Sequence, residues 1–161
     1  MNVWNLTNWK ENPVIKRSVR KSGLKLIFDK NINIEVRRAC KEFCQWLEIE
    51  YTFPTKIPIY VKGQATIKAL DGEQVSATFF YPYGLNGQPF IRVATGDYQT
   101  LVKRRGKDNA LASILTSIAH ELTHYFQWLN GLALKPRKEE RQAYKCARYI
   151  VQTYAEIREH P

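Results

Sequence analysis

Two histidines and a glutamate in the segment His120-Glu121-Leu122-Thr123-His124 carry the clearest chemical signal in the chain. The histidines are four residues apart, so on a helix both rings lie on one face and can reach the same metal ion. The glutamate that follows the first histidine is placed to act as a base toward water at the metal, as in HExxH zinc sites. We therefore predict that His120 and His124 bind Zn²⁺ and that Glu121 is the catalytic base.

The segment from Asp108 to Leu129 has the periodicity of one long helix. Its large apolar side chains form a single stripe, which consists of Leu111, Leu115, Ile118, Leu122, Tyr125 and Leu129. His120 and His124 fall on the opposite side, together with Ser113, Thr116, Ser117 and Gln127. A core histidine would lie on the apolar stripe, so this placement favours a pair that faces a polar groove. Asn130-Gly131 then predicts the end of the helix.

A hydrolytic zinc site needs a third protein ligand and an open position for water. His160 is a poor candidate because it stands next to the last residue of the sequence. An extended motif, H-E-x-x-H-x-x-G-x-x-H, is excluded because the chain has Gln127 and Asn130 at the positions of its glycine and third histidine. The remaining candidates are carboxylates on the next helix.

That next helix is expected from Lys138 to about Arg158. Its inward stripe consists of Ala143, Ala147, Val151 and Tyr154. Glu140 lies within about 30° of the centre of this stripe, whereas Glu139 lies roughly 75° away. The two alanines also allow a close approach to the neighbouring helix. Glu140 is therefore the predicted third ligand; the alternative is an exposed glutamate that the helix dipole favours in a first turn.

The C-terminal half resembles small zincin metallopeptidases of the gluzincin type, in which HExxH on one helix is completed by a glutamate from the next. The stretch from Glu140 to Ala147 is similar to the E-x-E-A-x-x-F-A segment of ImmA-type peptidases from mobile elements, and departs from it at Gln142 and Cys146. The resemblance covers residues about 75 to 151. It implies a twisted sheet over the active-site helix, with Phe90 to Thr95 as an edge strand that could pair with an extended peptide.

The chemistry that these residues predict is peptide-bond hydrolysis. Zinc lowers the pKa of water, and Glu121 takes the proton and then passes it to the leaving amine. The oxyanion needs a donor besides the metal, for which the candidates are Tyr144, Tyr98 and Tyr83. Tyr144 stands one residue beyond the helix face that carries Glu140, and we include it in the predicted catalytic set. The candidates for orienting the imidazole rings are Thr123, Gln127 and Asn130.

The first hundred residues show a mixture of strand and helix patterns. A helix is expected from Asn33 to Glu48, and strands at 24–28, 57–61, 75–81 and 89–95, with turns at 54–58, 71–72 and 83–87. Trp4 and Trp9 make the first dozen residues too apolar for a free tail. We predict one zincin-like α+β domain over residues 1–161. Its expected layout is a small, twisted, mostly antiparallel sheet packed on helices, including the active-site helix and the glutamate-bearing C-terminal helix.

Composition narrows the protein class. Of 161 residues, 44% are hydrophobic and 12% aromatic, which is typical of a globular protein. No apolar run has the length of a membrane span, and the start lacks a secretory apolar segment, so the expected location is cytoplasmic. Cys40, Cys44 and Cys146 are odd in number, which disfavours a disulfide framework. Cys40 and Cys44 share a helical face, and core packing is favoured over metal binding there.

The net charge is +10, and two other functions stay open. The basic residues cluster at 16–25, 103–107 and 135–141, and such a field attracts nucleic acid, anionic membrane or acidic protein. One alternative is a DNA-directed protease that resembles SprT-like enzymes, although those use a third histidine. The other is a binding protein that keeps a zincin fold without catalysis, which an intact HExxH disfavours. A protein or peptide substrate is the expected partner; the oligomeric state stays open.

Overall fold

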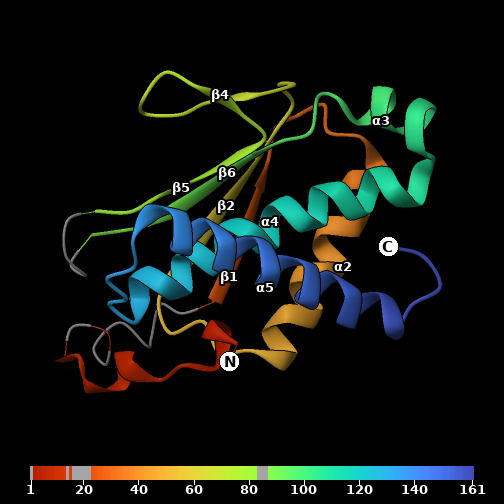
Figure 1. Cartoon of the computed structure of the whole chain (residues 1–161). Coiled ribbons are helices and arrows are strands. Elements are labelled where there is room, and N and C mark those ends of the chain that lie inside the picture. Colours follow the sequence, from red (N-terminus) through yellow and green to blue (C-terminus); the bar gives the residue numbers. More distant parts are fainter. Residues whose placement is uncertain (1, 14, 16–22, 83–86) are drawn as a thin grey trace.

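The structure is a computed structural model that describes residues 2–13, 15, 23–82 and 87–161. These residues form an α+β fold with mostly helical content and a small mixed sheet (Figure 1). In chain order the elements are η1 Val3–Asn5, η2 Asn8–Glu11, β1 Gly23–Phe28, α2 Ile34–Glu50, β2 Lys56–Lys62, β3 Ile67–Lys68, β4 Gln74–Val75, β5 Ala77–Phe80, β6 Phe90–Ala94, α3 Tyr98–Arg105, α4 Lys107–Leu129 and α5 Pro136–Glu156. The turn expected at 83–87 lies largely outside the described residues.

The main sheet has the strand order β1-β2-β6-β5. The β1–β2 and β2–β6 pairs are parallel, and only β5 runs antiparallel, against β6. The prediction of a mostly antiparallel sheet is therefore wrong. The chain returns to the same end of the sheet before each of β2 and β6, first through α2 and then through the β3–β4 hairpin and β5, and such crossovers produce parallel neighbours.

The expected edge strand is also wrong. Phe90 to Thr95 corresponds to β6, which lies between β2 and β5 inside the sheet. The edge strands are β1 and β5. The strand expected over 75–81 is divided in two at Ser76. Its first part, β4, pairs with β3 across the turn at Asp71-Gly72, where Gly72 has a φ of 88°. Its second part, β5, pairs with β6, so the sheet edge that faces the helices comes from β5.

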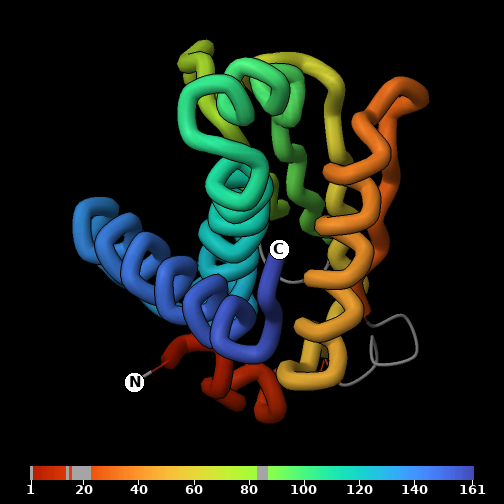
Figure 2. The backbone as a smooth tube through the Cα atoms, turned by 90° about the vertical axis from the view of Figure 1, so that its right-hand side faces the viewer, coloured from red at the N-terminus to blue at the C-terminus, as the bar shows by residue number. Residues whose placement is uncertain are grey.

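Helices α2 and α4 cover one face of the main sheet, and α5 packs on the side of α4 away from it (Figure 2). The apolar stripe predicted for α4 is confirmed, because all six of its residues are at most 1% exposed. Trp4 of η1 is 3% exposed and packs against Tyr51 and Phe126, which confirms that the first residues pack on the body. Helix α4 is thus held from several sides, and its remaining polar face carries the two histidines.

Local sequence signals explain where the helices begin and end. The Asn33 side chain caps α2 by accepting a hydrogen bond from the Glu35 amide at 2.8 Å. Helix α4 ends at Asn130, followed by Gly131 at a φ of 64°, as predicted. Helix α3 was not predicted; Gly106, with a φ of 84°, separates it from α4, and its polar composition hides it from periodicity.

The three cysteines are free thiols buried in the core, on α2 and α5. Burial raises the pKa of Cys40 to about 12, so this thiol stays neutral and packs as a small apolar side chain. No helix in the described part of the chain combines the length and the hydrophobicity of a membrane span.

Candidate metal centre

Adjacent faces of α4 and α5 bring together the three predicted metal ligands. Nε2 of His120 lies 3.2 Å from Oε2 of Glu140, and Nε2 of His124 lies 3.1 Å from Oε1 of the same carboxylate. One ligand atom from each of the three residues falls within 4.8 Å of the others. Tetrahedral ligands at about 2.1 Å from a zinc ion are about 3.4 Å apart. The two histidine–glutamate separations are close to that spacing.

Small side chains allow α5 to approach α4 at this point. Of the inward stripe expected from the sequence, Ala143, Ala147 and Tyr154 are buried. Val151 is only half-buried, and Ile150, which was not predicted, is fully buried instead. Glu140 stands one turn before Ala143 and its side chain is 59% exposed, whereas His120 and His124 are 18% and 13% exposed. The carboxylate is therefore the most exposed of the three predicted ligands.

Gln127 determines which nitrogen of the His124 ring is available to a metal. Its Nε2 lies 3.0 Å from the carbonyl of Glu139 and 2.9 Å from Oε1 of Gln142, two acceptors that require an N–H donor. The amide oxygen of Gln127 therefore faces Nδ1 of His124 at 2.8 Å and accepts from it. With Nδ1 committed to Gln127, Nε2 is the nitrogen of the His124 ring that is left to bind a metal. This is the nitrogen that faces Glu140.

A ring nitrogen that faces a carboxylate oxygen requires a cation or a proton between them. Burial lowers the pKa of His120, and the neighbouring His124 lowers it further, while Glu140 acts in the opposite direction. The net shift disfavours the imidazolium form of His120. Two imidazoles and one carboxylate form a donor set suited to a catalytic zinc ion. The residues present therefore fit the metal that the sequence predicts.

Glu121 lies beside the pair but is held out of the ligand set. It is 8% exposed, and burial, together with the charge of Glu140, raises its pKa to about 7. The charge of His124 and a backbone hydrogen bond from Phe79 lower it in part. A carboxylate whose pKa is near neutrality can both accept and release a proton at physiological pH. The contact with Phe79 also joins Glu121 to the edge strand β5, and no sequence pattern predicts this contact.

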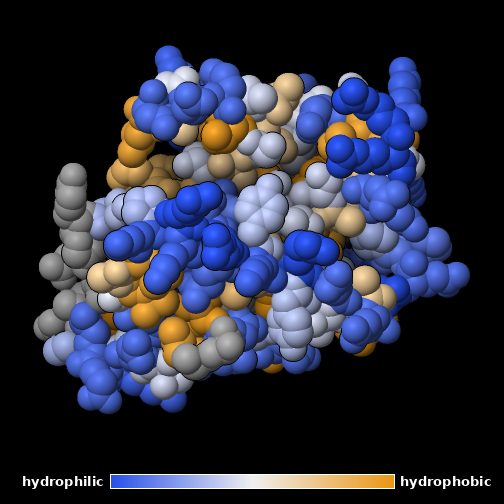
Figure 3. Space-filling model, in the orientation of Figure 1, coloured by the Kyte–Doolittle hydropathy of each residue, from blue (hydrophilic) through white to orange (hydrophobic). Residues whose placement is uncertain are grey.

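The site opens into a cleft of about 1110 Å³ between α4, α5 and β5. The small polar residues predicted to share the histidine face of α4 line it, namely Ser113, Thr116, Ser117 and Gln127. Phe79, Tyr81 and Trp128 line it as well. The outer surface of α5 beside the cleft is largely hydrophilic (Figure 3). An elongated ligand in the cleft would therefore meet both a polar helix face and an aromatic group.

The three tyrosines proposed as oxyanion donors differ in position. The ring of Tyr144 lies 5.4 Å from that of His120, edge to face, and its side chain lines the cleft. Tyr98 is 5% exposed at the start of α3 and does not line the cleft, so it is not placed for this role. Tyr83 lies outside the described residues. Tyr144 thus stays a predicted donor.

The candidates for orienting the rings are likewise separated. Of the three, only Gln127 contacts a histidine of the pair. The Thr123 hydroxyl instead donates to the Ala119 carbonyl and accepts from Nε1 of Trp4. The Asn130 side chain binds the Phe126 carbonyl and the Trp9 amide. The structure adds Gln142, which holds Gln127 in place. The sequence marks position 142 in one way: the chain has glutamine where the ImmA-type pattern has glutamate.

His160 is separated from this centre. Its Nδ1 lies 2.8 Å from Oδ2 of Asp108, at the N-terminal end of α4, and that contact raises the pKa of His160.

No family model, curated protein or solved structure matches the chain. The assignment of the metal centre therefore depends on the geometry of the centre itself.

Proposed function

We propose that this chain is a zinc-dependent metallopeptidase. The observation that carries the proposal is the convergence of His120, His124 and Glu140, with both Nε2 atoms facing one carboxylate. The buried Glu121, with a pKa raised to about 7, adds a base that a purely structural metal site would not need. A structural zinc site is closed by four protein ligands, whereas three ligands beside a cleft leave room for water and a substrate.

The residues divide the reaction between them. When bound, zinc supplies Lewis-acid activation of water and of the substrate carbonyl. Glu121 accepts the proton from the attacking water and transfers it to the amine that leaves. Gln127 holds the His124 ring in the tautomer that can bind a metal. Tyr144 is the proposed donor to the oxyanion.

The free edge of β5 is the proposed binding site for an extended segment of the substrate. The carbonyl of Ser76 accepts a hydrogen bond from the Ala94 amide, so the backbone groups of Ser76 face β6. Because these groups alternate along a strand, those of Ala77 and Phe79 face away from β6, toward the cleft. The Phe79 amide already donates to Glu121, which leaves its carbonyl and the groups of Ala77 for a substrate. A peptide could pair with this edge and pass the metal site beside Glu121. This role, expected at 90–95 from the sequence, moves to β5.

The decisive experiment compares wild-type protein with the Glu121→Gln variant, after both are loaded with zinc. Wild type should contain about one zinc ion per chain and hydrolyse an unfolded protein such as reduced casein, and a chelator should stop it. Glu121→Gln should bind zinc equally and lose at least about 100-fold in rate. A wild-type protein that takes up no zinc would overturn the proposal. A variant that cleaves at the wild-type rate would remove Glu121 from the mechanism but leave the metal site standing.

A further inference from the structure

The charged residues of the main sheet are all cations. The four strands contain Lys25, Lys56, Lys62 and Arg92 and not one aspartate or glutamate. Ile57, Ile59 and Val61, which alternate with the two lysines of β2, are fully buried. Because side chains alternate across a strand, the cations lie on the opposite face.

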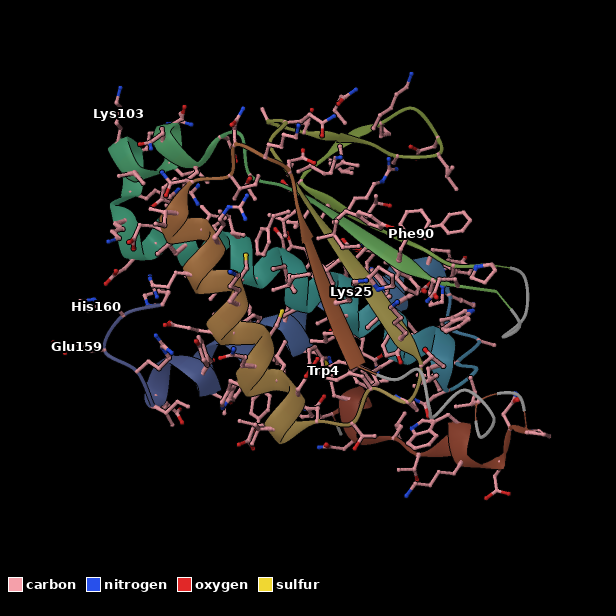
Figure 4. The ribbon with its side chains drawn as sticks, turned by 180° about the vertical axis from the view of Figure 1, so that it is seen from behind. Trp4, Lys25, Phe90, Lys103, Glu159 and His160 are labelled. Atoms are coloured by element: carbon pink, nitrogen blue, oxygen red, sulfur yellow. The ribbon has the colours of Figure 1, made fainter. Side chains whose placement is uncertain are left out.

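That face is turned away from the helices. The buried partners Ile91 and Val93 of β6 point toward α4, so Arg92 points the other way. The register places Tyr60 and Thr78 on either side of Arg92, on the same face. No described helix covers this face, which Figure 4 presents from behind with Lys25 and Phe90 labelled on it. We call it the outer sheet face.

An aromatic group occupies the outer sheet face between the cations. The rings of Phe80 and Phe90 stack across β5 and β6 with centroids 4.8 Å apart, and Tyr60 of β2 meets Phe90 edge-on at 5.8 Å. All three side chains are half-buried. Stacking across strands stabilises a sheet by itself, but it also presents π surface on a platform that strands keep rigid.

The cations around these rings are largely uncompensated. Within the described residues Lys25, Lys56 and Arg92 have no ion pair, whereas Lys62 pairs with Asp29 at 3.1 Å. Among the residues that the structure describes, Arg92 donates only to the carbonyl of Lys68, at 3.3 Å, and its Nε has no hydrogen-bond partner. This half-buried guanidinium therefore keeps donor capacity that an anionic ligand can use.

We propose that the outer sheet face binds single-stranded nucleic acid. The phosphates would pair with Lys25, Lys56 and Arg92, and unstacked bases would lie on Tyr60 and Phe90. A duplex keeps its bases stacked and cannot use the rings, and an acidic peptide has no flat bases to place on them. The site is separate from the metal centre, and the inference does not depend on the proposed peptidase activity.

The test measures fluorescence anisotropy of labelled 20-nucleotide dT and rU strands and of a 20-base-pair duplex, against the wild-type protein. Lys25→Gln with Lys56→Gln is compared with Lys103→Gln with Arg104→Gln, which removes the same charge from exposed positions of α3. The sheet pair should reduce the salt slope for single strands by about 1.4, since each phosphate contact contributes about 0.7. The α3 pair should leave the slope nearly unchanged.

Phe90→Leu tests the rings separately from the charges. It should weaken single-strand binding by about 5-fold or more, whereas Tyr149→Leu, on the exposed side of α5, should not. The comparison of dT with rU decides between DNA and RNA. Equal losses from the sheet pair and the α3 pair, tighter binding of the duplex, or binding of anionic vesicles alone would each overturn the proposal.

A measurement on unaltered protein covers the case in which Phe90→Leu fails to fold. A strand that carries 5-iodouracil is irradiated with the wild-type chain, and the cross-linked residue is located by mass spectrometry. Cross-links at Tyr60, Phe80 or Phe90 support the proposal. Cross-links confined to other residues, or the absence of any, overturn it.

Discussion

Nδ1 of His124 donates to the side-chain oxygen of Gln127 across 2.8 Å. Gln127 is 2% exposed, and its amide nitrogen is occupied by the Glu139 carbonyl and Gln142. Both ends of this side chain are therefore fixed, and with them the tautomer of His124. The longer zinc motif has glycine at this position. In this chain the glutamine at the same position orients a predicted metal ligand.

Gln127→Leu should reduce zinc affinity by about 10- to 100-fold, which is typical of losing a group that orients a ligand. Gln142→Ala is the matched control: it removes one acceptor from the Gln127 nitrogen but keeps the contact with His124, and its effect should be smaller. Competition with a chromophoric chelator measures both affinities. Equal affinities for Gln127→Leu and wild type would show that the hydrogen bond does not position the ring.

Glu140→Gln should weaken zinc binding by at least about 100-fold, because an amide oxygen is a poorer zinc ligand than a carboxylate. Glu139→Gln changes the adjacent residue by the same charge. Its carboxylate lies 3.8 Å from Nδ1 of His124, on the side away from Nε2, so it should bind zinc almost as wild type does. Zinc content after dialysis at a fixed chelator concentration distinguishes the two variants. Similar losses in both would mean that only net charge matters.

Regular periodicity made the two C-terminal helices predictable. Each long helix buries an apolar stripe, so the angular position of His120, His124 and Glu140 could be calculated from spacing alone. The contact between Gln127 and Gln142 could not, because it depends on how closely two helices pack. It becomes visible only when both backbones are placed.

The sheet was predicted less well, for a related reason. Strands β2 and β6 have clear patterns, but a pattern does not specify neighbours, and parallel pairing depends on where the crossovers run. Ser76 interrupts a continuous β-prone run without any glycine or proline to mark the break. The pattern therefore predicts β6 as the strand that borders the metal centre, whereas the structure has β5 there.

Glu121→Gln should stabilise the metal-free protein at neutral and alkaline pH. The folded state raises the pKa of this carboxyl from 4.5 to about 7, so the folded protein binds the proton more tightly than the unfolded chain. Stability of wild type therefore falls as the pH rises from about 4.5 to 7, by a maximum of about 3 kcal/mol. Urea unfolding with chelator at pH 4.5 and pH 8 should show a Gln advantage that grows between them. An advantage independent of pH would contradict the raised pKa.

Trp4→Ala should destabilise the fold by about 3–5 kcal/mol, the usual cost of removing a large buried aromatic. Trp4 is 3% exposed, and its indole nitrogen donates to the Thr123 hydroxyl inside the HELTH segment at 2.9 Å. Trp9→Ala provides the control, because Trp9 is only half-buried and should cost much less. Urea unfolding measures both free energies. Equal losses of unfolding free energy in the two variants would contradict the view that η1 stabilises α4, the helix that carries the two histidines.

Tyr144→Phe should lower kcat by about 100- to 1000-fold if the hydroxyl donates to the oxyanion. The substitution keeps the ring, which meets His120 at 5.4 Å, so zinc content and KM should change little. Tyr81→Phe is the matched control, since Tyr81 also lines the cleft and is 57% exposed, against 67% for Tyr144. Initial rates over a range of substrate concentrations separate kcat from KM. A Tyr144→Phe protein with the wild-type kcat would mean that the ring only packs against His120, and that another group in the cleft stabilises the oxyanion.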